Sequence, residues 1–154
     1  MLGGVFDKEI KIGDRASRDE RKAMIARKHG HCFEGKLLVL VDSRSASASE
    51  LSARVVQIEK RGVVLGDLSS GMVMVAQFHD YDGVGAEITE ADIIMTDGKS
   101  LEQVGVTPDE VVLPTTADLL EGRDPVLARA AELAGVQLSP EAAGKLFPYE
   151  WPPQ

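Results

Sequence analysis

The sequence has little of several features that define whole classes of protein. Among its 154 residues there is one cysteine, Cys32, so no internal disulfide framework can form. No apolar run approaches the roughly 20 residues that a membrane-spanning helix needs. Positive charge is in deficit, because 17 Lys and Arg stand against 25 Asp and Glu, for a formal net charge of -8. This balance argues against nucleic acid as a partner, since phosphate binding needs a basic surface, and against docking on an anionic membrane.

Aromatic residues are also scarce, at 5% of the chain, although hydrophobic residues reach 44% and charged residues 27%. A core must therefore be built from Val, Leu, Ile, Ala and Met, in an overall composition that is ordinary for a globular protein. The length suffices for one domain with an apolar core. The first four residues, Met1-Leu2-Gly3-Gly4, lack the charged start and apolar middle of a signal peptide.

The strongest structural pattern begins after Lys36. Residues 37–41 form an uninterrupted apolar run, which is typical of a strand buried on both faces of a parallel sheet. A helix pattern follows, with Leu51, Val55 and Ile58 on one apolar face and Gly62 just beyond its end. Residues 63–66 then predict a second buried strand. Strand, helix and strand together predict a right-handed crossover and, with it, an α/β fold.

The rest of the chain predicts further elements around this crossover. We expect strands at residues 73–78, 86–95 and 110–113, with a turn at residues 80–83 between the first two. The pair Asp124-Pro125 predicts the start of a last helix, which runs to Ala134. Met72 and Met74 alternate along a strand, so we expect them to pack in the core. The acidic residues 118–124 indicate a solvated loop or a short turn.

We interpret the chain as a single domain in three parts. Residues 1–35 form an N-terminal arm, in which residues 5–12 could hold a short strand and the charged residues 15–31 predict an exposed arm or loop. Residues 36–113 form the core that carries the motifs. Residues 114–154 form a C-terminal helix and tail, and the prolines after residue 147 predict that the tail is extended.

The segment of residues 45–50, SASASE, lies where the first buried strand becomes a helix. A serine there gains free backbone N–H groups and the positive end of the helix dipole, which together stabilise a developing oxyanion. The small neighbours Ala46 and Ala48 let a substrate backbone approach closely. The spacing also fits an ordinary helix start, because Ser47 and Glu50 match a capping box.

Three motifs, by their order and spacing, resemble the tail-specific (C-terminal-processing) serine peptidase family. They are VLVDSRSASASE at residues 39–50, RGVVLGD at residues 61–67 and GVTPD at residues 105–109. The resemblance runs from about residue 35 to residue 113. It implies a crotonase/ClpP-like fold of stacked ββα units, of which this chain is the C-terminal part. It also implies that Ser47 is the nucleophile and that the N–H of Ala48 contributes to the oxyanion hole.

The sequence departs from a typical member of that family at the catalytic base. Such a member has a lysine directly after the glycine that corresponds to Gly71, and this sequence has Met72 there. Methionine cannot take a proton from the nucleophile. The supporting glutamine expected four residues later is Ala76, with Gln77 one position away. A Ser–Lys mechanism is therefore not available from these residues.

Relatives similar to the tricorn core protease use a Ser–His–Glu arrangement instead. Their glutamate lies three residues before the glycine of the third motif, which here is Glu102. The resemblance implies that Glu102 orients an imidazole and stabilises its charged form, although one loop glutamate among many is ordinarily just solvated. The histidine would come from an N-terminal part of the same protein outside this chain. The Gly-rich oxyanion segment would come from there too, since Gly3-Gly4 matches it poorly.

The histidines of the chain itself have ordinary interpretations. His29 and His31 lie in the charged arm and His79 lies at a strand end, and their spacing fits no recognised metal site. A catalytic pair of Cys32 with His31 is disfavoured, because neighbours in a strand point to opposite faces. We therefore expect no metal and no organic cofactor.

Together these inferences predict a serine endopeptidase that cleaves polypeptide substrates through an acyl-enzyme on Ser47. Because no base is present, we expect the 154-residue chain alone to be inactive. The missing lysine leaves one alternative, an inactive peptide-binding or assembly module, and acyl-thioester chemistry on the same fold ranks behind both. By family analogy the location is the bacterial cell envelope or periplasm. Assembly into a homo-oligomer stays open.

Overall fold

The structure, a computed structural model, describes residues 2–148 and contains two β-sheets. An antiparallel sheet has the strand order β2-β1-β6-β5. Its strands are β1 (Ile10–Ser17), β2 (Arg21–Ala26), β5 (Val75–Tyr81) and β6 (Val84–Met95). A parallel sheet has the order β3-β4-β7 and consists of β3 (Leu37–Val41), β4 (Gly62–Gly66) and β7 (Glu110–Val111). The α/β fold class is confirmed.

The predicted crossover is present. Helix α1 (Ala48–Ile58) joins β3 to β4, and these two strands pair in parallel from Leu37 with Gly62 to Val41 with Gly66. The strands expected at residues 73–78 and 86–95 form the hairpin of β5 and β6, whose turn lies within the predicted residues 80–83. Thus hydrophobic periodicity located both of these units to within a few residues.

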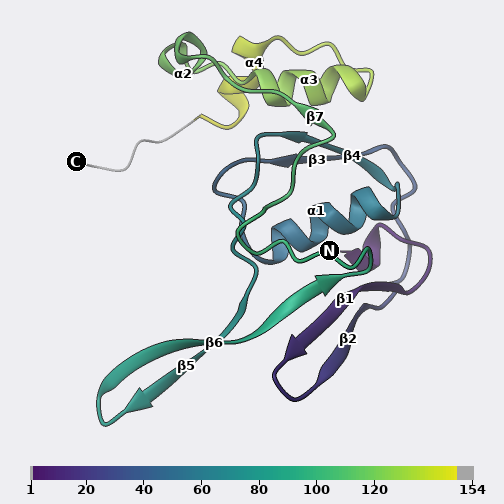
Figure 1. The fold of residues 1–154 in the computed structure, drawn as a ribbon. Coiled ribbons are helices and arrows are strands. Elements are labelled where there is room, and N and C mark those ends of the chain that lie inside the picture. The colour runs from purple at the N-terminus through teal and green to yellow at the C-terminus, as the bar shows by residue number, and fades with distance from the viewer. Residues whose placement is uncertain (1, 149–154) are drawn as a thin grey trace.

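The elements stack in layers with α1 at the centre. Figure 1 shows α1 between the parallel sheet and the antiparallel sheet, with helices α2 (Thr116–Glu121), α3 (Pro125–Leu133) and α4 (Pro140–Leu146) over the opposite face of the parallel sheet. Arg129 on α3 ties this helical layer to β7, because its Nε donates to Glu110 Oε1 at 2.6 Å. Within residues 2–148, no helix has the length and apolar character to cross a membrane.

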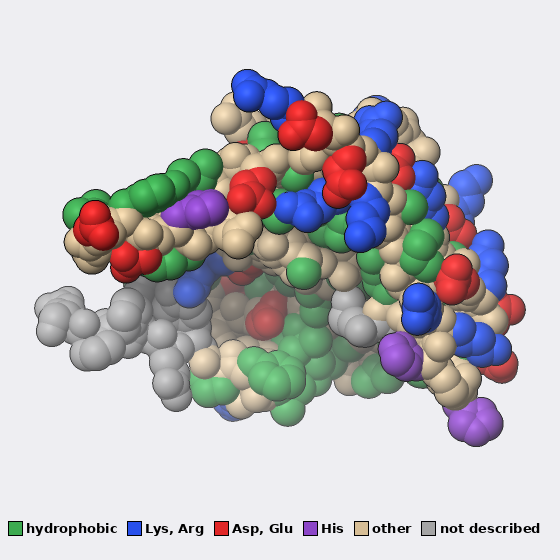
Figure 2. Space-filling view, turned by 90° about the horizontal axis from the view of Figure 1, so that it is seen from below, with side chains coloured by type: hydrophobic (Ala, Val, Ile, Leu, Met, Phe, Trp, Pro, Cys, Tyr) green, Lys and Arg blue, Asp and Glu red, His purple; other side chains and the backbone are tan. Residues whose placement is uncertain are grey.

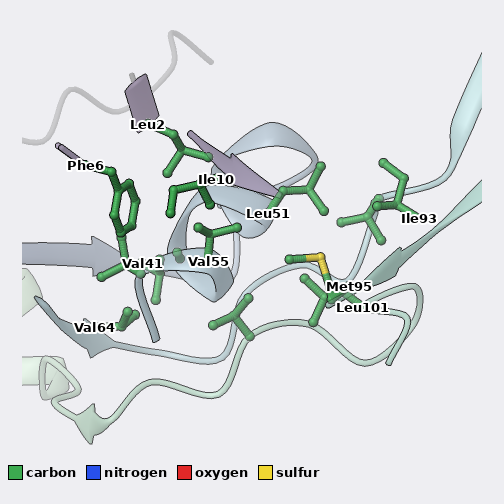
Figure 3. Packing of buried hydrophobic residues seen from close by; sticks show 14 residues of the cluster. Leu2, Phe6, Ile10, Val41, Leu51, Val55, Val64, Ile93, Met95 and Leu101 are labelled. Atoms are coloured by element: carbon green, nitrogen blue, oxygen red, sulfur yellow. The ribbon is translucent and has the colours of Figure 1, made fainter. Parts of the chain in front are cut away.

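The core lies around α1 and includes the N-terminal end of the described chain. Figure 3 shows Leu2, Phe6 and Ile10 from the N-terminal segment packed towards Leu51 and Val55 of α1. Each such buried apolar side chain contributes about 1.5–3 kcal/mol of transfer free energy. The N-terminal segment is therefore part of the folded core, including the short 3₁₀ turn η1 (Leu2–Gly4).

The prediction of an exposed arm or loop at residues 15–31 is wrong for most of that stretch. Residues up to Ser17 belong to β1, and β2 follows after a short turn. The charged side chains misled the prediction because β2 is an edge strand, so that most of its side chains face solvent. β1 instead approaches β6 so closely that a Cβ on Gly13 would lie 2.5 Å from the Ile94 carbonyl oxygen.

The prediction of a loop or short turn at residues 118–124 is wrong for residues 118–121 and holds for residues 122–124, which connect α2 to α3. Residues up to Glu121 belong to α2, whose N-cap Thr115 accepts a hydrogen bond from the Asp118 N–H at 3.1 Å. Gly122 ends the helix in the left-handed conformation, with φ of 63°. The last predicted helix is confirmed as α3, whereas α4 was not predicted. The tail beyond residue 148 lies outside the described residues.

Acidification is expected to destabilise the start of α2. The Thr115 hydroxyl and N–H, together with the Arg123 guanidinium, lower the pKa of Asp118 to about 2. The stabilisation from ionised Asp118 is thus complete above the unfolded pKa and is lost as the pH falls from about 4 through 2. The free energies of unfolding of the parent protein and of Asp118→Asn, both measured with urea, should differ most above pH 4 and become equal towards pH 2. A difference that stays constant across this range would contradict the assignment.

Candidate functional site

A tight turn carries the chain from the end of β3 to the start of α1. Ser45 Oγ donates to Asp42 Oδ1 at 2.9 Å, and the Arg44 N–H donates to the same oxygen at 3.0 Å. The Asp42 N–H donates in return to Ser45 Oγ at 3.1 Å. A bond from the Ser70 N–H to the Ser45 carbonyl, 2.9 Å long, links this turn to the loop after β4. The residues that lead into the helix are therefore held from two directions.

Ser47 is exposed at the N-cap of α1 and has an unusual backbone. Its φ is 57° and its ψ is -122°, whereas an N-cap residue is normally extended with negative φ. A non-glycine residue in such a region costs about 1–3 kcal/mol and persists only where the surroundings impose it. Two acceptors hold the Ser47 N–H here: the Met72 carbonyl oxygen at 2.9 Å and Glu50 Oε2 at 3.0 Å. The strain presents the serine hydroxyl at a sharp strand-to-helix turn.

The residue after Ser47 is the first of the helix. In the described part of the chain, the Ala48 N–H has no hydrogen-bond acceptor. It belongs to the first turn of α1, where N–H groups have no partner within the helix and the helix dipole is positive. This group can therefore donate to an anionic oxygen formed next to the serine hydroxyl.

Glu50 is the residue of the site that sequence reasoning undervalued. Its side chain is fully buried. Besides the Ser47 N–H, it accepts from Ser69 Oγ at 2.5 Å, from the Gly71 N–H at 2.7 Å and from the Met72 N–H at 3.0 Å. The capping-box interpretation covered only the local half of this network. The bonds to residues 69–72 join α1 to the loop between β4 and β5, and only the fold brings them together.

Glu102 holds the same loop from the other side. Its Oε2 accepts from the Val73 N–H at 2.9 Å and from the Met74 N–H at 3.1 Å. Residues 71–74, which we call the clamped segment, thus give four consecutive N–H groups to two carboxylates, Glu50 and Glu102. No donor contacts Glu102 Oε1 among residues 2–148, so this oxygen is available for another group.

Both residues of the predicted site therefore hydrogen-bond to the same loop. Ser47 contacts the clamped segment through the Met72 carbonyl, and Glu102 contacts it through the next two residues. The expectation that Met72 and Met74 pack in the core is wrong, because they are 66% and 40% exposed. They belong to the loop that faces the nucleophile turn and precede β5, so strand alternation does not bury them.

The histidines lie apart from this arrangement. His79 is in β5, where its Nε2 lies 3.4 Å from Glu90 Oε1 and its ring stacks on Tyr81. His29 and His31 are exposed in the segment between β2 and β3, which also holds the half-buried Cys32. Among the residues described, no three His, Cys, Asp or Glu side chains gather as metal ligands would.

A cavity of about 520 Å³ opens at the carboxyl edge of the parallel sheet. It lies beneath α2 and α3 and reaches the turn before α1 through Ser43 and Ser45. Neither Ser47 nor Glu102 lines it. The residues of the predicted site therefore lie outside this cavity.

The chain is similar to known peptidases in both sequence and fold. The sequence profile described as Peptidase family S41 matches residues 4–112, which extends the predicted resemblance to the N-terminal segment. A carboxy-terminal-processing protease of Bartonella bacilliformis is 28% identical over 158 residues, covering 92% of this chain and 36% of its own length. The chain thus spans about a third of the length of that relative.

Two solved structures show the same fold. A photosystem II D1 C-terminal processing protease matches with a TM-score of 0.67 at 23% identity, covering 92% of this chain and 36% of that one. The tricorn protease matches with a TM-score of 0.67 at 19% identity, covering 87% of this chain and 13% of that one. The predicted resemblance is confirmed at the level of family and fold.

Proposed function

Because the chain belongs to peptidase family S41, we propose that the full-length protein is a serine endopeptidase of the C-terminal-processing type, with Ser47 as nucleophile. The observation that carries the proposal is the strained backbone of Ser47, held by two hydrogen bonds beside the free N–H of Ala48. A strained serine exposed on a strand-to-helix turn is similar to the nucleophile turn of α/β-hydrolases, which supports the assignment.

The reaction proceeds through an acyl-enzyme. The Ser47 oxygen attacks the carbonyl carbon of the scissile peptide bond while its proton passes to a general base. The oxyanion that forms is stabilised by the Ala48 N–H and the helix dipole. The protonated base then gives its proton to the leaving amine as the C–N bond breaks. Water, activated by the same base, hydrolyses the ester and regenerates Ser47.

Glu102 supports the base in this proposal. Its Oε2 is fixed by the Val73 and Met74 N–H groups, which leaves Oε1 to orient an imidazole and stabilise its charged form. Met72 cannot serve as the base. The imidazole is supplied by a histidine outside these 154 residues, so the chain alone is inactive. By family analogy we assign the protein to the bacterial cell envelope or periplasm; the relative in Bartonella bacilliformis supports only the bacterial part of this assignment.

Fluorophosphonate labelling of the full-length protein tests the proposal. The probe should modify Ser47, as mapped by mass spectrometry, and Ser47→Ala should abolish the label at this site. Glu102→Gln keeps the shape of the side chain but removes its charge, so the labelling rate should fall roughly a hundredfold or more. Glu34→Gln, on an exposed glutamate between β2 and β3, is the matched control and should label at the parental rate.

Folded protein that leaves Ser47 unlabelled would reject the peptidase proposal. The exposed Met72 in the position of a catalytic lysine favours one other function in that case, a peptide-binding module that has lost catalysis. Normal labelling in Glu102→Gln would instead limit Glu102 to holding the clamped segment.

A further inference from the structure

β5 forms one edge of the antiparallel sheet, and this edge leads away from the nucleophile turn. Within residues 2–148, β5 pairs with β6 on one side only. It begins three residues after Met72, whose carbonyl oxygen accepts the Ser47 N–H. The four steps of chain from Met72 to Ala76 span at most about 14 Å. The unpaired edge therefore starts within a few substrate residues of Ser47.

The hairpin register decides which backbone groups face away from β6. Asp82 and Gly83 form its two-residue turn with φ of 54° and 87°, as a type I′ turn requires. Tyr81 and Val84 close this turn as a hydrogen-bonded pair, so bonded and non-bonded pairs alternate back along β5. The residues whose N–H and C=O groups point outward are then Asp80, Phe78 and Ala76.

These outward groups are the first free backbone donors along the loop. All four N–H groups of the clamped segment are taken by Glu50 and Glu102. From Ala76 onward, the carboxylates make no further contact with the backbone of the edge. Next to Ser47, a polypeptide that lies along β5 would find backbone N–H groups that are already hydrogen-bonded. From Ala76 onward it would find backbone N–H and C=O groups that are available for hydrogen bonds.

β5 lacks two of the residues that most often protect an edge strand, Lys and Pro, and Asp80 is its one acidic residue. Exposed edge strands are commonly blocked by Lys, by Pro or by a covering segment, and the sequence of β5, VAQFHDY, contains neither residue. The hairpin projects from the body of the molecule (Figure 1), and hydrophobic side chains gather along the projection in Figure 2. Phe78 and Tyr81 are 67% and 57% exposed there.

We propose that the outer edge of β5 binds the substrate polypeptide as an added β-strand and so guides the scissile bond to Ser47. The ligand is an extended polypeptide recognised through its main-chain N–H and C=O groups, with little demand on side-chain sequence. That the bound polypeptide is delivered to Ser47 for cleavage rests on the proposed peptidase function. Binding of the polypeptide to β5 is independent of that function, because Ser47 takes no part in the binding.

A proline scan of the two sheet edges tests this in the full-length protein carrying Ser47→Ala, which prevents turnover. Ala76→Pro removes the outward N–H nearest Ser47, and proline is tolerated on an edge strand where the N–H faces solvent. Ala23→Pro is the control on β2, the opposite edge, where counting from the Ser17–Glu20 turn also directs the N–H outward. Fluorescence anisotropy with labelled β-casein, an unfolded polypeptide, measures the affinity. Ala76→Pro should weaken it roughly tenfold, and Ala23→Pro should leave it unchanged.

Hydrogen exchange supplies a second measurement that needs no proline. The amides of Ala76, Phe78 and Asp80 should exchange rapidly in the free protein and slow when β-casein is added. Equal affinities of the two proline variants would overturn the proposal. So would slow exchange of these amides without β-casein, because another part of the protein would then occupy the edge. The two proposals can also fail separately. If Ala76→Pro weakens binding of β-casein but the protein with Ser47 intact is not labelled by fluorophosphonate, the β5 binding site is supported and the peptidase function is rejected.

Discussion

Glu50→Ala is expected to lower the free energy of unfolding of the full-length protein by about 4 kcal/mol and to abolish fluorophosphonate labelling of Ser47. The buried carboxylate accepts from four groups, the N–H of Ser47, Gly71 and Met72 and the hydroxyl of Ser69. An unpaired buried donor costs about 1–3 kcal/mol, and water entering the space left by the side chain offsets part of the sum. The positive φ of Ser47 then loses one of its two restraints.

Glu50→Gln is the matched variant because it keeps the size of the side chain. One of its two oxygens becomes an NH₂ group that faces donors, so about half of the loss should remain, roughly 2 kcal/mol. Urea unfolding measures both variants, and the labelling rate is compared under conditions where each is folded. A Glu50→Ala protein with parental stability and labelling would show that the network does not hold the site.

The second large effect is expected at Gly66, where β4 ends. A Cβ there would lie 2.0 Å from the carbonyl oxygen of Val41, which is backbone of the neighbouring strand and cannot turn aside. Its φ of 122° is also one that a side chain strongly disfavours. The clash and the strain together should cost about 4 kcal/mol in Gly66→Ala. Since β3 leads into the turn before Ser47, labelling should fall as well.

Gly4→Ala is the control for Gly66→Ala. A Cβ on Gly4 meets nothing within 4 Å, and its φ is not positive. Its free energy of unfolding should stay within about 0.5 kcal/mol of the parent. If Gly66→Ala had the same denaturation midpoint as Gly4→Ala, the close approach of β3 and β4 at this point would be refuted.

The crossover was predictable because its signals are local. The apolar run of β3, the periodicity of α1 and the glycine after it each specify an element over a few residues. The short strand expected within residues 5–12 covers only the start of β1, and β2 was not predicted because most of its side chains, at the edge of the sheet, face solvent. β1 also pairs with β6, from Gly13 with Met95 to Ser17 with Ala91, and a local pattern does not reveal a pairing over that distance in the sequence.

The candidate site divides in the same way. Ser47 and Glu102 were found from motifs, and their catalytic roles remain predictions. Sequence analysis identified only the capping role of Glu50. Its hydrogen bonds from α1 to Ser69, Gly71 and Met72 could not be predicted, because these partners lie in the loop between β4 and β5. Exposure of Met72 was likewise beyond sequence reasoning, because the strand that would bury it starts only at Val75.

The clamped segment has a consequence for how such a site changes over evolutionary time. Its shape is set by main-chain N–H groups and two carboxylates, and the side chain of residue 72 takes no part in those bonds. A lysine or a methionine can therefore stand at this position on the same backbone path. A lineage could exchange the proton acceptor for one drawn from elsewhere without rebuilding the scaffold that carries the serine.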